Sequence, residues 1–340
     1  MILDALIIGH GLAGAVLAET LRHQGLRFHV LHGDRPGAAS PVAAGMVNPI
    51  AFRRDIATWR AALTMPLADD FYTRWEQRLG VPVWKRMPLA KIFPSEDAAM
   101  RWQRAAEDPD TAAFIGAKPS SAFDDLPLQR PFGHGMVTTA AWLDVARALE
   151  AHRAMLQAEG CCSHRVVPDE AIEHEADHIR IDGFKARWSI RCLGPFDRVQ
   201  GLVPVKGETI VVRIPDLPLE RMVHRGIFLI PLGDALFRVG ATYKWTDVWA
   251  GPTTEAREML LEGLGKIVRS PVEVVDHLAG VRPAARDRRP ILGRVGEREA
   301  VLNGLGSRGV LLAPWCASHL AAHLFNGAAL DPEVDVARFA

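Results

Sequence analysis

The sequence has few cysteines and no net charge. Its 340 residues include four cysteines, and none of them forms a CxxC pair. The neighbouring Cys161 and Cys162 are poorly placed to bridge each other. This scarcity argues against a disulfide framework and indicates reduced thiols in a cytoplasmic protein. Lys plus Arg and Asp plus Glu both number 40, so no overall charge attracts nucleic acid or an anionic membrane. Neutrality favours a small-molecule substrate over a nucleic acid.

Long hydrophobic runs and metal-binding motifs are also absent from the sequence. The apolar N-terminal run is interrupted by Asp4 and is too short for a membrane span. No basic leader accompanies it, so export is not expected. The thirteen histidines show no HExxH or similar spacing, and we predict no metal site. With 49% hydrophobic and 24% charged residues, the chain is expected to form one large domain or two interlocked ones.

The clearest positive feature is the glycine-rich segment GHGLAG, which begins at Gly9. A short apolar run precedes it, and a helix-like segment (15–25) and a second strand-like segment (26–32) follow. This order predicts a strand, a tight turn, a helix and a second strand, the unit that binds dinucleotides. In that unit Gly9 permits the turn, Gly11 lets a pyrophosphate approach the backbone, and Gly14 lets helix and strand pack closely. The pattern leaves FAD and NAD(P) open.

The acid that usually binds the adenosine ribose is missing at the end of the second predicted strand. His32 stands in its place. Asp34, two residues later, could reach the ribose from the loop, whereas Arg35 is compatible with the phosphate-bearing ribose of NADP. The sequence therefore leaves the identity of the ribose anchor open.

Three further stretches resemble the glycine oxidase and D-amino-acid oxidase family of FAD flavoproteins. They are SPVAAGMVNPI (40–50), AGVRPAARDRRPILG (279–293) and NGLGSRGVLLAP (303–314). In that family the first is a small-residue loop against the flavin, the second is the GxRP segment, and the third is a glycine-rich flavin loop. The resemblance covers essentially the whole chain and implies FAD. A cysteine attachment segment like the family's is absent, since Cys316 lies beyond the second glycine loop, so we predict that the FAD is non-covalent.

Within the superfamily, GSRG and GATY (240–243) are most similar to the oxidase domain of the bifunctional enzyme that matures methylaminomethyl-thiouridine in tRNA. The methyltransferase half of that enzyme has no counterpart here. The resemblance implies an α/β fold in which a Rossmann-like FAD-binding domain is combined with a discontinuous, mainly antiparallel substrate domain. The implied division assigns residues 1–80, 136–200 and 272–340 to the FAD-binding domain and residues 81–135 and 201–271 to the substrate domain.

A second glycine loop stands directly before the last predicted helix. A helix N-terminus there could stabilise the negative charge of a reduced flavin ring, although an ordinary loop before a terminal helix is the alternative interpretation. RWSIRCLG (187–194) resembles the strand that ends at the adenine side of the cofactor. Together these segments imply the following cofactor-binding residues: Gly9, Gly11, Leu12, Ala13, Gly14, His32, Asp34, Ala43, Ala44, Gly45, Met46, Gly194, Arg282, Gly304, Gly306, Ser307, Arg308, Gly309 and Val310.

Arg282 and Tyr243 are the candidate catalytic residues. The family's arginine at GxRP binds the substrate carboxylate, and an arginine fork matches a carboxylate bidentately. The alternative for Arg282 is an ion pair with Asp276 or Asp287. Tyr243 ends a predicted strand (236–244), where its phenol could reach the ligand or serve as a core or rim aromatic.

Other basic residues are weaker candidates for substrate contact. Period-two alternation places Arg238 and Lys244 on the face of that strand opposite Tyr243. Surface solvation is the expected state of Arg53, Arg54 and Lys206.

These features predict an FAD-dependent oxidase or dehydrogenase that removes hydride from the carbon beside an amine and leaves an imine for water to hydrolyse. The substrate is expected to be a small amine or amino acid, and the electron acceptor is oxygen or another molecule. Two alternatives stay open: an oxidase acting on a tRNA wobble-uridine side chain, and a flavin-binding protein without turnover.

Overall fold

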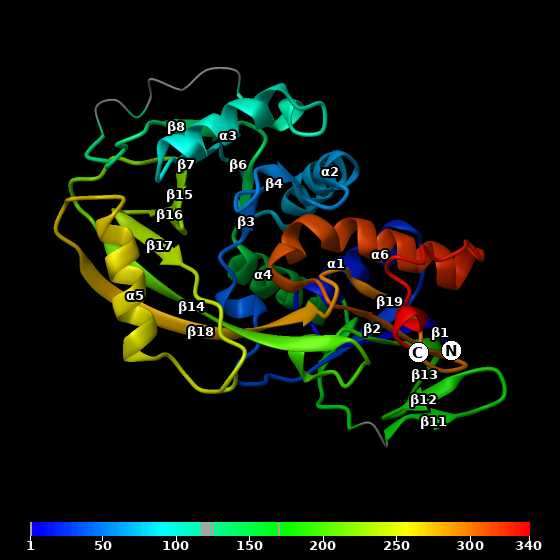
Figure 1. The fold of residues 1–340 in the computed structure, drawn as a ribbon. Helices are drawn as coiled ribbons and strands as arrows, with labels where there is room; N and C mark the ends of the chain where they lie inside the picture. The colour runs from blue at the N-terminus through cyan, green and yellow to red at the C-terminus, as the bar shows by residue number, and fades with distance from the viewer. Residues whose placement is uncertain (1, 117–122, 124–125, 169–170) are drawn as a thin grey trace.

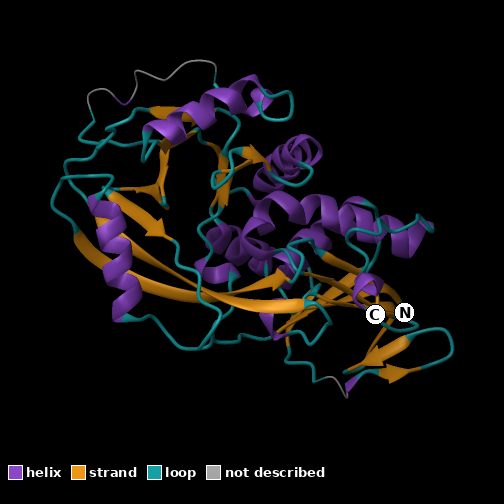
Figure 2. Ribbon diagram, in the orientation of Figure 1, coloured by secondary structure: helices purple, strands orange, loops and turns teal. Residues whose placement is uncertain are grey.

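The structure is a computed structural model that describes residues 2–116, 123, 126–168 and 171–340. Two large sheets make up the α/β architecture, one of eight strands and one of seven, with a cluster of helices beside the first (Figure 1). Figure 2 shows the long curved strands of the second sheet with a single helix against them. In the described part of the chain, no helix is long and apolar enough to cross a membrane.

The eight-stranded sheet has a parallel core. β1 pairs in parallel with β2 and β13, β2 pairs in parallel with β10, and β13 pairs in parallel with β20. The residues of β1 and β2 are buried along their whole length, as expected of strands covered on both faces. The strands of this sheet are β1 (Leu3–Ile8), β2 (Phe28–His32), β10 (Cys162–His164), β11 (Glu173–His174), β12 (Ile179–Ile181), β13 (Phe184–Arg191), β19 (Ile291–Arg294) and β20 (Glu299–Asn303).

Four helices pack together beside this sheet: α1 against α4 and α6, and α2 against α4 and α6. Side-chain caps begin three of the helices, with Ser95, Asp144 and Thr253 each accepting a backbone N–H from the first turn of α3, α4 and α5. The helices are α1 (Leu12–His23), α2 (Ala61–Leu79), α3 (Glu96–Glu107), α4 (Val145–Ala158), α5 (Thr254–Gly265) and α6 (Gly309–Asn326).

The seven-stranded sheet has the order β18-β14-β17-β16-β15-β7-β8 and is antiparallel except where β15 meets β7. Its strands are β7 (Leu89–Ile92), β8 (His134–Val137), β14 (Leu202–Arg213), β15 (Met222–Arg225), β16 (Ile227–Gly233), β17 (Leu236–Gly240) and β18 (Glu273–Ala285). Two small sheets contain β3 (Met46–Val47), β6 (Trp84–Arg86) and β9 (Ala141–Leu143), and β4 (Ile50–Ala51) with β5 (Ile56–Ala57).

The pairing register assigns residues of the seven-stranded sheet to its two faces. Val205 pairs with Arg282, and Val211 pairs with Arg238, before a register shift at Val211/Val212. Positions 205 and 211 have the same parity, so Arg282 and Arg238 lie on one face. α5 packs against the sheet, and Thr253 at the start of α5 binds Glu208, which belongs to the opposite face.

The long strand β18 bears on the predicted domain division. It belongs to the segment 272–340, assigned to the cofactor domain, yet it pairs with β14 along nearly its whole length. Arg282 is therefore presented by the sheet that also contains most of the predicted substrate segment. The exact division stays a prediction.

Candidate functional site

The first glycine segment forms a tight turn between β1 and α1. Gly9 has a φ of +109°, and a Cβ there would lie 2.5 Å from the carbonyl oxygen of Cys192. A Cβ at Gly14 would overlap the Gly9 carbonyl oxygen, so Gly14 allows the helix to pack on the turn. Gly11 differs, because a Cβ there would meet only the Ser40 side chain, 3.1 Å away at Oγ. Gly11 thus leaves open backbone at the carboxyl edge of the parallel sheet, where dinucleotides bind.

The first turn of α1 follows directly. Leu12 and Ala13 begin the helix, and the backbone N–H of Leu12 donates to Ser40 Oγ at 3.1 Å. Because Leu12 is buried, only its backbone could meet a cofactor. The helix N-terminus carries partial positive charge and fits a pyrophosphate.

The end of β2 places histidines where an acid usually lies. His32 is 4% exposed, and its ring lies 6.2 Å from that of His10 in the glycine turn. His10 Nε2 lies 3.1 Å from Nδ1 of His152, and burial lowers the pKa of His10 to about 3. Asp34 is exposed and has Arg153 Nη1 at 3.7 Å. The ribose anchor stays open between His32 and Asp34, and the buried partner His152 gave no sequence signal because it lies on the distant α4.

The small-residue loop after β2 is fixed by hydrogen bonds from two directions. Gly45 has a φ of +77°. Trp142 Nε1 donates to the Ala44 carbonyl at 2.9 Å. Arg238 Nη1 donates to the Ala43 carbonyl at 2.8 Å. The loop therefore lies against the face of the seven-stranded sheet that carries Arg238.

The second glycine segment meets the first. Gly304 has a φ of +70°, and a Cβ there would lie 2.7 Å from Ile291 Cγ1. A Cβ at Gly309, the first residue of α6, would lie 3.3 Å from Leu12 Cδ2 in α1. Two glycine turns almost 300 residues apart in the sequence thus open two helices side by side.

The remaining predicted residues of this loop divide by exposure. Ser307 and Arg308 are exposed, whereas Val310 is buried and its carbonyl accepts from Tyr72 Oη at 2.8 Å. Gly194 joins the loop through Asn303, whose Nδ2 donates to the Gly194 carbonyl at 2.9 Å. The sequence analysis did not name Asn303 as a site residue, although it is the first residue of the predicted glycine-rich segment (303–314).

Arg282 and Tyr243 are in contact. The Arg282 guanidinium carbon lies 4.3 Å from the centre of the Tyr243 ring. Nη1 of Arg282 donates to the Thr242 carbonyl at 3.1 Å and to the Lys206 carbonyl at 3.4 Å. A Cβ at Gly207 would overlap the guanidinium, so this glycine makes room for the arginine.

The two ion pairs considered for Arg282 do not form. Asp287 pairs instead with Arg338, whose Nε lies 2.8 Å from Asp287 Oδ2. Within the described residues, Arg282 has no acidic side chain within 4 Å, and burial lowers the pKa of its guanidinium. The second glycine loop approaches at the same end of β18, where Ala284 bridges to Leu305. Arg282 is thus a half-buried cation without an acidic partner among the described residues, next to the predicted cofactor loop.

Two details of the sequence prediction were wrong. β17 ends at Gly240, so its alternation is broken before Tyr243, and Lys244 pairs separately with Lys206 on the face opposite Arg238. As a result, Tyr243 contacts Arg282 on the same face of the sheet as Arg238, and it is 53% exposed. Lys206 is not on the surface: it is 1% exposed and its Nζ lies 2.7 Å from Glu208 Oε1.

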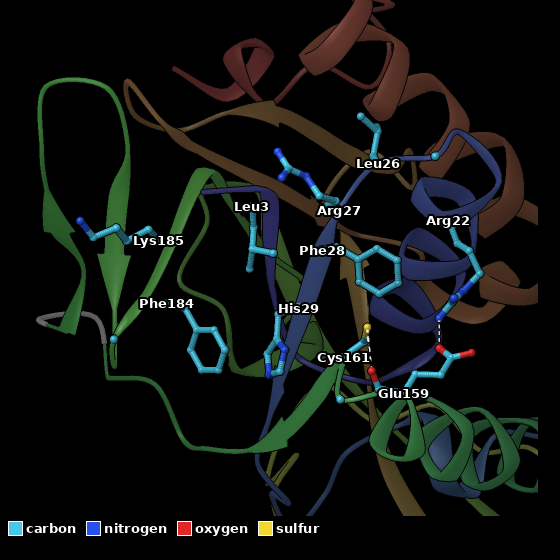
Figure 3. A pocket seen from close by; sticks show the side chains of 13 residues that line it. Leu3, Arg22, Leu26, Arg27, Phe28, His29, Glu159, Cys161, Phe184 and Lys185 are labelled. Atoms are coloured by element: carbon cyan, nitrogen blue, oxygen red, sulfur yellow. Dashed lines mark hydrogen bonds and ion pairs between the residues drawn. The ribbon is translucent and has the colours of Figure 1, made fainter. Parts of the chain in front are cut away.

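A cavity of about 580 Å³ lies apart from the glycine turns and from Arg282. Figure 3 shows its lining, which includes the starts of β1, β2 and β13. Ligands of open parallel sheets bind at the opposite, carboxyl ends of the strands. The charges at its wall are partly neutralised, since Arg22 pairs with Glu159. Among the described residues, no group of three or more His, Cys, Asp or Glu side chains could bind a metal ion.

The chain matches a family model, curated relatives and solved structures. The family model DAO, described as FAD dependent oxidoreductase, matches residues 4–323. Over 345 residues, the chain is 25% identical to the tRNA 5-methylaminomethyl-2-thiouridine biosynthesis bifunctional protein MnmC of Idiomarina loihiensis, covering 94% of this chain and 55% of that protein. It is 31% identical over 364 residues to glycine oxidase of Bacillus subtilis, covering 95% of this chain and 93% of that protein.

The fold is also found among solved structures. The crystal structure of glycine oxidase from Geobacillus kaustophilus matches with a TM-score of 0.78 at 22% identity, covering 97% of this chain and 96% of that one. The chain spans about half the length of the first curated relatives it matches. These matches confirm the predicted fold class and the FAD cofactor. The chain belongs to the DAO family of FAD-dependent oxidoreductases.

Proposed function

We propose that this enzyme oxidises the C–N bond of a small amino acid or secondary amine whose carboxylate is bound by Arg282. FAD supplies the hydride acceptor when bound. The observation that carries the proposal is Arg282 itself, a half-buried guanidinium without an acidic partner among the described residues. A cation in such a position favours an anionic ligand, because a buried charge is stabilised by pairing.

The chain's contribution is binding and orientation. Carbonyls of Thr242 and Lys206 accept from Nη1 of Arg282, which fixes the plane of the guanidinium fork. The Tyr243 ring lies against that plane and restricts the fork further. A carboxylate bound there would keep the reacting carbon in one place, and such positioning lowers the barrier by reducing the entropy lost in the reaction. An amine that binds deprotonated needs no dedicated base.

Gly11 and Gly309 fit the cofactor. Gly11 offers open backbone at a helix N-terminus, and Gly309 begins a second helix beside it. We propose that these segments contact the pyrophosphate and the flavin end respectively, through backbone N–H groups. His32 and Asp34 are the proposed contacts on the ribose side.

Anaerobic mixing with a panel of amino acids and secondary amines tests the proposal. The yellow absorbance of the oxidised flavin should disappear with at least one carboxylate-bearing amine. If no amine in a broad panel bleaches the flavin while dithionite does, the proposed substrate class is wrong.

A second candidate is a tRNA side chain, because several of the curated relatives carry the name of a tRNA biosynthesis protein. The balance of 40 basic and 40 acidic residues opposes it. Filter binding of tRNA at increasing salt separates the two candidates: a tRNA enzyme should bind with a steep salt dependence.

A further inference from the structure

The face of the seven-stranded sheet that carries Arg282 also carries Arg238, a second arginine for which the described residues supply no ion-pair partner. Arg238 pairs across the ladder with Val211, and Arg282 pairs with Val205. Gly207 and Gly280 pair with each other on the same face between them. A Cβ at Gly280 would overlap the Val42 side chain, so this face lies directly against the small-residue loop.

Arg238 is bound to that loop and not to a carboxylate. Its Nη1 donates to the Ala43 carbonyl at 2.8 Å, and its Nε is buried without a hydrogen-bond partner in the described structure. Within the residues described, no acidic oxygen lies within 4 Å of its guanidinium. Val211 pairs with Arg238 on one side and with Asp276 on the other, so Asp276 lies two strands from Arg238. By strand spacing, their backbones are roughly 10 Å apart. Burial lowers the pKa of Arg238, and the carboxylates of Asp144 and Asp276 act on its charge only at longer range. Among the described residues, Arg238 therefore has no direct ion-pair partner.

The substrate proposed above does not supply the missing anion. Val205 and Val211 are six positions apart along β14, which corresponds to roughly 20 Å between their backbone levels. The Arg282 guanidinium reaches the level of Gly207, so roughly 13 Å along the strand separates it from the level of Arg238. An amino acid bound by Arg282 is too small to extend over that distance.

The small-residue loop also contacts the predicted cofactor turn, because the backbone N–H of Leu12 donates to Ser40 Oγ. Since the chain belongs to an FAD-dependent family, bound FAD is the anion that we expect beside this loop.

We propose that Arg238 positions the small-residue loop and stabilises negative charge on the reduced flavin, so that it raises the reduction potential of bound FAD. The physical basis is electrostatic: a partly buried cation without a direct ion pair favours the more negative form of a nearby group. The inference concerns the cofactor alone, so it does not depend on which amine is the substrate.

The test is the midpoint potential of FAD in the purified holoprotein and in the variants R238M, R238Q and R238K. R238M and R238Q remove the charge and should favour oxidised FAD at least tenfold, a fall of about 30 mV for a two-electron couple. R238K keeps a positive charge, so the midpoint potential of its FAD should be closer to that of the wild type. The control is R213M, which removes a half-buried arginine at the end of β14 whose Nε lies 3.7 Å from Glu273 Oε2.

The outcomes separate an electrostatic role from a structural one. A lower potential in R238M and R238Q with normal FAD content, and an unchanged potential in R213M, would support the proposal. An unchanged potential in R238Q, or an equal shift in R213M, would overturn it. Loss of FAD from all three Arg238 variants would also overturn it, because Arg238 would then be needed only to keep the loop in place.

Discussion

At the scale of single residues, the close approach of Gly207 to the Arg282 guanidinium allows a test of whether the position of this guanidinium matters for catalysis. A Cβ at Gly207 would overlap the end of the arginine side chain, which can move only by leaving its place beside Tyr243. Gly207→Ala should therefore lower kcat/KM for a carboxylate-bearing amine about ten- to a hundredfold, the range for losing a charge-assisted hydrogen bond. FAD content should not change.

Gly251→Ala is the matched control, since a Cβ there has no heavy atom within 4 Å. Steady-state kinetics of both variants decide the question. An equal fall in kcat/KM in both variants, or no fall in Gly207→Ala, would show that the position of the Arg282 guanidinium does not limit catalysis.

The buried histidines predict a loss of stability in acid. His10 has an ordinary pKa of 6.5 when unfolded and a pKa lowered to about 3 by burial in the fold. Above pH 6.5 the residue is neutral in both states, and its contribution to stability is complete. As the pH falls below 6.5, the unfolded chain binds a proton that the folded chain does not bind. The free energy of unfolding should therefore fall by about 1.4 kcal/mol per pH unit for this residue.

Urea unfolding at about pH 7.5 and about pH 5 measures this effect. His10→Gln removes the titrating group and should show a shallower decline in stability than the wild type. An identical decline in both proteins would mean that His10 is not held neutral in the fold.

At the scale of elements, two glycines of the first turn, Gly11 and Gly14, are predicted to respond differently to substitution. Gly11 has a φ of −81° and only the Ser40 side chain nearby, so Gly11→Val should fold. It should lose FAD, because the new side chain fills the approach to the helix N-terminus. Gly14→Val should not fold well, since a Cβ there overlaps the Gly9 carbonyl oxygen of the turn.

Absorbance spectra and circular dichroism of the two variants check this contrast. Retention of FAD by a folded Gly11→Val protein would mean that the segment is only a structural turn.

The same elements show what the sequence could predict. The GxGxxG turn with its flanking strands has a local pattern, and β1, α1 and β2 form where that pattern places them. The end of β17 at Gly240 could not be predicted, because β-branched and aromatic residues continue past it. The burial of Lys206 depends on Glu208 and on the Gly251 carbonyl, and the latter contact joins residues 45 positions apart.

At the scale of the whole molecule, the candidate site forms where the two sheets meet. Arg282 and Arg238 come from the seven-stranded sheet, and the glycine turns come from the other sheet and its helices. The sequence motifs predicted which segments contribute to this site. Contacts between distant segments, such as that of Trp142 with Ala44, arise only from packing and have no sequence pattern.

The packing also predicts that FAD is released by acid. Cys162, Cys192 and Cys316 are buried, and burial raises the pKa of the Cys162 thiol to about 11. Burial likewise raises the pKa of the Cys192 and Cys316 thiols well above the usual range. A protonated thiol is a poor nucleophile, so covalent attachment through these residues is not expected. Acid precipitation should leave all yellow colour in the supernatant, and colour in the pellet would contradict non-covalent binding.

The central claim, that a carboxylate-bearing amine is oxidised while held by Arg282, is tested most directly by anaerobic stopped-flow reduction of wild type and Arg282→Lys. Lysine keeps the charge but loses the bidentate fork. With the carboxylate-bearing substrate, the variant should reduce its FAD about ten- to a hundredfold less efficiently. A second substrate of similar structure, an amine that lacks the carboxylate, should reduce the FAD of the wild type and of the variant equally slowly. Equal losses on both substrates, or loss of FAD from the variant, would contradict the assignment of Arg282 to the substrate.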